Sequence, residues 1–105
     1  MTKLLSQEQI NQYDNSGFVS PIDVLNQDEI RQSLKEIENF EEKTGKPIDF
    51  PHKSRCHQLF SWADDLVHHP KILDAVEDII GPDILCYHAT LWVKPAQSNS
   101  FVRWH

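Results

Sequence analysis

The chain has 105 residues, of which 39% are hydrophobic and 25% charged, an ordinary balance for a small globular domain or part of a larger one. Its 16 acidic residues outnumber its 10 basic residues, and the net charge of −6 makes nucleic acid and anionic membrane surfaces unexpected partners. No apolar run approaches the roughly 18–20 residues that span a bilayer, and the N-terminus lacks the apolar stretch of a secretory signal, which predicts a cytoplasmic protein.

The first helix is predicted to begin at Ser6 and to end at Gly17. Ser6 followed by Gln9 has the form of a capping box, in which each side chain bonds the backbone N–H of the other residue. Gly17 stands where a helix commonly closes on a left-handed residue. Phe18 and Val19 are then predicted to form a short extended segment.

A second helix is predicted to follow Asn26, which repeats the capping pattern with Glu29. The apolar residues behind it recur at helical spacing and therefore share one face: Ile30, Leu34, Ile37 and Phe40. Gly45 and Pro47 are expected to stop this helix. Residues 48–54 show no periodicity, which predicts a loop.

Two further helices are predicted in the second half of the chain. The third runs near 59–67, and its inward-facing residues are predicted to be Leu59, Phe60, Ala63 and Leu66. The fourth covers 72–80, with an apolar side made of Ile72, Leu73, Val76, Ile79 and Ile80. Gly81 and Pro82 directly after it are typical of a sharp helix end.

From residue 84 the pattern alternates instead of following a helical period. Residues 84–94 are rich in β-branched and aromatic side chains and lack Gly and Pro, which predicts a long strand. One face of it carries unusually polar residues: Cys86, His88, Thr90, Trp92 and Lys94. After a loop at 95–100, residues 101–105 are predicted to start another strand. Because fewer than three strands rarely hold together in water, these strands are expected to find partners in a longer chain or in another copy.

Three features in this order suggest a family. They are the helix that runs into Gly81-Pro82, the strand that ends in Val93-Lys94-Pro95, and the pair Trp104-His105 about ten residues later. Together they resemble the N-terminal portion of the phytanoyl-CoA dioxygenase (PhyH)-like Fe(II)/2-oxoglutarate-dependent oxygenases, and the resemblance covers nearly the whole chain. It implies an α+β fold with helices over about 1–82 and the first strands of a double-stranded β-helix, or jelly roll, over about 83–105. That fold would be incomplete in this chain.

The resemblance also implies roles for individual residues. In the family, two histidines and one carboxylate hold the iron and leave positions for 2-oxoglutarate and O2, and His105 would be the first histidine. Thr90 falls where family members contact 2-oxoglutarate, although a β-branched residue also simply suits a strand. Lys53 falls where a basic residue reaches the cosubstrate, and Arg55 takes that role if the alignment slips by two. Otherwise both are solvated cations in a loop.

The function implied is oxygenation, most simply hydroxylation, of a small organic or natural-product substrate, with no catalytic side chain in these 105 residues. This chain alone is therefore expected to be inactive. A halogenase of the same family remains an alternative, because the deciding position lies two residues after His105. A non-catalytic module that binds a partner through its open strands is a second alternative. His88 has no metal-site spacing; it could face the active-site side of the predicted strand, but the prediction is a hydrogen-bonded core histidine.

Overall fold

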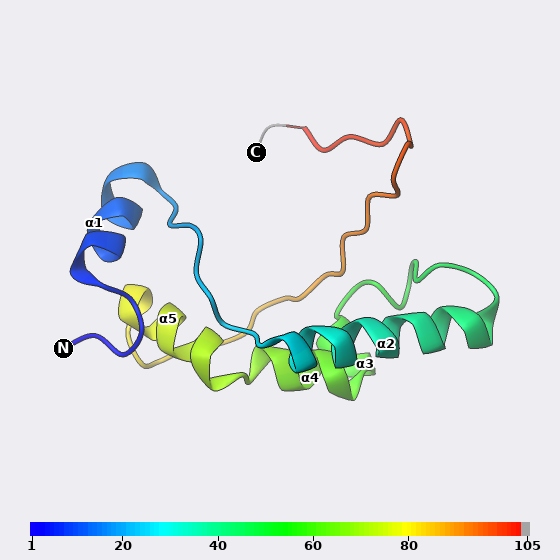
Figure 1. Cartoon of the computed structure of the whole chain (residues 1–105), viewed down its shortest axis with the longest axis horizontal. Coiled ribbons are helices and arrows are strands. Elements are labelled where there is room, and N and C mark those ends of the chain that lie inside the picture. The colour runs from blue at the N-terminus through cyan, green and yellow to red at the C-terminus, as the bar shows by residue number, and fades with distance from the viewer. Residues whose placement is uncertain (104–105) are drawn as a thin grey trace.

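The computed structural model describes residues 1–103, and the regular elements within that range are helices (Figure 1). They are α1 (Gln7–Ser16), α2 (Gln27–Thr44), α3 (Cys56–Leu59), α4 (Ser61–Val67) and α5 (Pro70–Ile80). Helix α4 packs against α2, α3 and α5. The chain after α5 leaves the helices as an extended trace and turns back above them (Figure 1).

The predicted ends of the first two helices are confirmed. The Ser6 hydroxyl accepts the N–H of Gln9 at 3.2 Å, and the Gln9 side chain accepts the N–H of Ser6 at 2.9 Å. Asn26 and Glu29 make the same reciprocal pair at 2.8 and 3.1 Å. Gly17 closes α1 with φ of 78°, a left-handed conformation that glycine adopts without steric cost. These helix ends therefore depend only on neighbouring residues.

The third predicted helix is interrupted. Phe60 has extended backbone angles (φ −124°, ψ 126°) and separates α3 from α4. Its ring meets the ring of Phe40 edge-on at a centroid distance of 5.0 Å, so the break places Phe60 against the end of α2. Leu59, predicted to face inward, is 55% exposed, whereas Ala63 is buried as predicted.

The fourth predicted helix is confirmed as α5. It begins at Pro70, where the missing N–H of proline removes no intrahelical bond. The side chain of His69 caps it by accepting the N–H of Lys71 at 3.2 Å. Gly81 follows the last turn, and its N–H donates to the carbonyl of Glu77 at 2.8 Å.

The α+β jelly-roll expectation is wrong for the part of the chain that the structure describes, because residues 1–103 contain no β-strand. The predicted strand 84–94 is extended, but it meets another segment only at an isolated antiparallel bridge between Ser54 and Thr90. Residues 101–103 form no strand, and the rest of that prediction lies outside the described residues. A strand needs hydrogen bonds to a second backbone. The alternation of side chains over 84–94 does not show that a second backbone is present.

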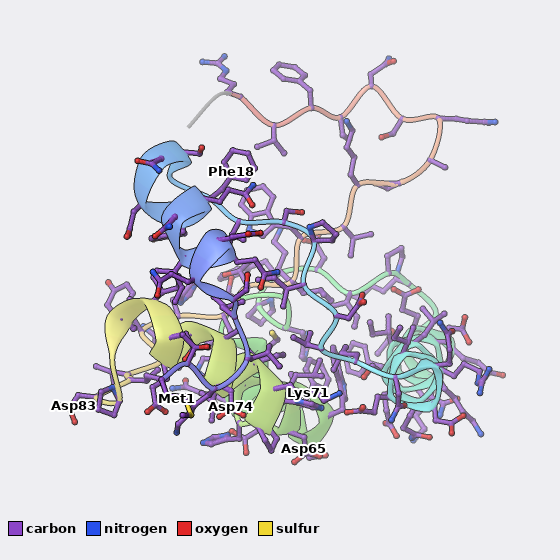
Figure 2. All side chains as sticks on the ribbon, turned by 60° about the vertical axis from the view of Figure 1, so that its left-hand side comes forward. Met1, Phe18, Asp65, Lys71, Asp74 and Asp83 are labelled. Carbon is purple, nitrogen blue, oxygen red and sulfur yellow. The ribbon has the colours of Figure 1, made fainter. Side chains whose placement is uncertain are left out.

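The extended C-terminal segment, residues 84–103, is held by few contacts. Towards its C-terminal end the side chains stand clear of the helices (Figure 2), and large apolar ones are exposed along the segment: Leu85 by 86%, Tyr87 by 93%, Trp92 by 77% and Phe101 by 72%. Exposed apolar side chains on both faces are the expected result when an alternating segment has no sheet to pack against.

Candidate functional site

A pocket of about 900 Å³ lies between the loop that follows α2 and the extended C-terminal segment. Residues within 46–54 form one wall, and residues within 88–95 and 100–102 form the other. Two backbone hydrogen bonds join the walls. The N–H of Leu91 donates to the carbonyl of Lys53 at 2.9 Å, and the N–H of Cys56 donates to the carbonyl of Ala89 at 3.2 Å.

Lys53 and Thr90, both predicted to contact the cosubstrate, line this same pocket. They come from segments far apart in the sequence, and the bridge between Ser54 and Thr90 brings the two backbones together. Thr90 is half-buried, and the Lys53 side chain is 43% exposed. An ammonium group and a hydroxyl group are thus available to one ligand.

Asp49 is the acidic partner of Lys53 in the pocket. The Lys53 ammonium lies 3.0 Å from the Asp49 carboxylate, and both side chains line the cavity. This hydrogen bond, followed by the one from the Phe50 N–H, lowers the pKa of Asp49, which keeps the carboxylate ionised at neutral pH. Lys46 and Lys94 also line the pocket, so its described lining contains three lysines and one acidic residue. The charge balance favours an anionic ligand.

His88, for which a position on the active-site side was the less favoured alternative, contacts Thr90 directly. Its Nε2 lies 2.6 Å from the Thr90 hydroxyl, and both residues line the pocket. The prediction of a core histidine is wrong, because His88 is exposed. The available signal was the spacing: residues two apart on an extended chain point to the same side.

Of the two remaining predicted site residues, Arg55 does not line this pocket and His105 lies outside the described residues. Arg55 is exposed, has a left-handed backbone (φ 55°) and is not among the described residues that line the cavity. Of the two predicted basic residues, Lys53 is therefore the one that lines the cavity with Thr90. His105, the predicted metal ligand, lies outside the described residues. Residues 1–103 contain no group of three or more His, Cys, Asp or Glu side chains that could hold a metal ion.

Comparison of the chain with protein-family models, curated proteins and solved structures finds no match. The family resemblance therefore stays a prediction, and the pocket has to be interpreted from its own chemistry. Among the helices of the described range, none has the length and apolar character needed to cross a membrane.

Proposed function

We propose that the pocket binds 2-oxoglutarate and that the chain forms the cosubstrate-binding part of a non-haem iron oxygenase that acts on a small organic substrate. One observation carries the proposal: Lys53 and Thr90, assigned to the cosubstrate by resemblance, line the same cavity. Iron supplies the oxygen chemistry of such enzymes when it is bound. Since residues 1–103 hold no complete ligand set for it, we assign to them the cosubstrate alone.

The lining suits a dicarboxylate. An ammonium group has three hydrogens, so Lys53 can bond Asp49 and still donate to a ligand carboxylate. The Thr90 hydroxyl supplies one further donor, and the ammonium groups of Lys46 and Lys94 add positive potential. Ligand pockets usually measure about 300–1,000 Å³. At about 900 Å³ this cavity has room for 2-oxoglutarate and for part of a second molecule.

The test is titration of the metal-free chain with 2-oxoglutarate, followed by calorimetry or ligand-detected NMR. Lys53→Ala removes a charged donor and should weaken binding roughly 5- to 10-fold, a range that allows for its exposure. Thr90→Val removes a neutral donor and should weaken binding roughly 2- to 5-fold. Arg55→Ala is the matched control, because it removes a nearby cation that does not line the cavity.

Two outcomes would count against this function. If Arg55→Ala weakens binding as much as Lys53→Ala does, the loss reflects net charge and not the pocket. If inorganic phosphate binds as tightly as 2-oxoglutarate, the pocket is a general anion site and the assignment of the cosubstrate is lost. A preference for the dicarboxylate that disappears in Lys53→Ala supports the proposal.

A further inference from the structure

We propose that His88 is a positioning residue for the anion in this pocket and that it acts through the hydroxyl of Thr90. The inference rests on the proposed function, because it concerns the same ligand. It is carried by the 2.6 Å contact between His88 Nε2 and Thr90 Oγ1 and by the position of both residues in the cavity lining. No role for His88 follows from the family resemblance.

The direction of this hydrogen bond decides what Thr90 offers to a ligand. A hydroxyl group has one hydrogen and two lone pairs. If Nε2 of His88 carries no hydrogen, it accepts the hydrogen of Thr90, and only lone pairs remain to face the anion. If Nε2 carries a hydrogen, it donates to Thr90, whose own hydrogen is then free for a carboxylate. The first arrangement repels the ligand, and the second binds it.

Protonation of His88 selects the second arrangement. Both nitrogens of an imidazolium donate, whereas Nε2 of a neutral ring donates in only one of its two tautomers. The imidazolium also adds a positive charge to the pocket wall. Binding of an anion should therefore be coupled to uptake of a proton, and affinity should rise as the pH falls from 8 to 6.

The other charged groups that face the cavity do not change charge over this interval. Lys46, Lys53 and Lys94 are cations throughout it. The pKa of Asp49 is lowered by the Lys53 hydrogen bond, so this carboxylate stays ionised. Two further residues with titratable groups adjoin His88: the Tyr87 ring lies 6.4 Å from the His88 ring, and the Cys86 thiol donates to the His88 carbonyl at 3.9 Å. A pH dependence between 8 and 6 that is lost in His88→Gln and kept in Cys86→Ser would thus report on His88.

The experiment measures the Kd of 2-oxoglutarate for the metal-free chain at pH 8, 7 and 6. For the wild-type chain we expect affinity to rise roughly 3- to 10-fold from pH 8 to pH 6. His88→Gln retains a hydrogen-bonding amide but does not titrate, so its profile should be flat. His68→Gln is the matched control: His68 is an exposed histidine outside the cavity lining, and the wild-type profile should persist.

Variants at Thr90 separate positioning from a simple charge effect. Thr90→Ser keeps the hydroxyl and should keep the pH dependence. Thr90→Val removes it, and most of the pH dependence should be lost even though the imidazole of His88 is still present. An unchanged slope in Thr90→Val would show that His88 acts by charge alone and would overturn the inference.

The same titrations separate the two proposals. If the wild-type chain does not bind 2-oxoglutarate at any pH, the proposed function fails. If it binds with a flat pH profile, the function stands and the role of His88 is refuted. Folding of each variant can be checked by its helical circular dichroism. This check is independent of binding, because His88 and Thr90 lie outside the helices.

Discussion

Asp78 holds Leu5 in the core through the backbone: Oδ2 of Asp78 accepts the Leu5 N–H at 2.7 Å, and Leu5 is only 1% exposed. The same carboxylate accepts the N–H of Lys3 at 2.7 Å and that of Leu4 at 2.8 Å. Three successive N–H groups are thus bound by one side chain of α5. This arrangement fixes the N-terminal segment against the helix before α1 begins.

Asp78→Asn should lower the thermal midpoint at pH 7 by several degrees, because the amide places an NH2 group against N–H donors. The N–H of Lys3 and then those of Leu4 and Leu5 hold the pKa of Asp78 below its ordinary value of 3.8. A lowered pKa in the folded state contributes stability above 3.8, and this is lost as the pH falls through the lowered value. The difference in midpoint between wild type and variant should therefore shrink at acidic pH.

Asp65→Asn is the control for Asp78, since Asp65 is an exposed acidic residue on α4. Asp65→Asn should leave the thermal midpoint almost unchanged at pH 7 and at pH 2. A difference for Asp78→Asn that persists undiminished at pH 2 would show that the ionised carboxylate is not the source of the stability.

A second long-range contact joins α2 to the start of α5. Nε2 of His69 bonds the Glu29 carboxylate, and the two side chains are 16% and 35% exposed. Nδ1 of His69 accepts the N–H of Lys71, so the hydrogen of the neutral ring must sit on Nε2 and point to Glu29. The N-cap of α5 thus sets the tautomer that makes the contact between helices.

A double-mutant cycle tests this coupling. Glu29→Gln preserves the capping box, which accepts Glu or Gln at that position, and weakens the His69 contact. Glu29→Gln and His69→Ala should each lower the free energy of unfolding, and the double variant should lose less than the sum of the two. His68→Ala, at an exposed neighbouring histidine, should combine additively with Glu29→Gln. Additive losses for the Glu29 and His69 pair would refute the coupling.

The pH dependence of this contact has a defined sign. The N–H of Asn26 and then the hydrogen bond from His69 hold the pKa of Glu29 below its ordinary value of 4.5. The stability that Glu29 contributes is therefore present above 4.5 and is lost as the pH falls through the lowered value. The deficit of Glu29→Gln, measured by chemical unfolding, should be full at pH 7 and should diminish below pH 4.5.

The helices could be predicted from the sequence and the pairing of the C-terminal segment could not, because the two depend on partners at different distances along the chain. The caps at Ser6 and Asn26 use partners three residues away, so the local sequence contains the whole signal. The strand predicted over 84–94 depends on a second backbone, and the described chain offers one only near Ser54. Side-chain alternation indicated that the segment is extended, and it could not indicate what the segment pairs with.

The site was predictable to a similar degree. Resemblance singled out Lys53 and Thr90 as individual positions, whereas their meeting in one cavity depends on the backbone bond between Leu91 and Lys53. The contact of Thr90 with His88 also needs the extended conformation that the structure supplies. Sequence spacing placed these two residues on one face but did not show that their polar atoms meet.

Asp49→Asn should strengthen the binding of 2-oxoglutarate, because it removes the carboxylate that competes for the Lys53 ammonium. We expect a gain of about threefold at low salt and a smaller one at high salt, as for other exposed charge interactions. Asp83→Asn changes the net charge equally at an exposed residue that does not line the cavity (Figure 2). An equal gain in both variants would mean that overall charge, and not the Asp49 pair, limits binding.

A facial triad requires two histidines and a carboxylate, and residues 1–103 contain no group of three such ligands. We therefore expect anaerobic Fe(II) and 2-oxoglutarate to give no charge-transfer band with this 105-residue chain, even where 2-oxoglutarate alone binds. A band of normal strength would contradict this.

In any form of the protein that does bind iron, His105→Ala should abolish the charge-transfer band. His57→Ala is the control, because His57 is a histidine of α3 that does not line the cavity. Its removal should leave the band in place. Since a metal ligand cannot be replaced by alanine without loss of the metal bond, iron retained in His105→Ala would exclude His105 as a ligand. The cosubstrate assignments of Lys53 and Thr90 would then have to stand on the binding titrations alone.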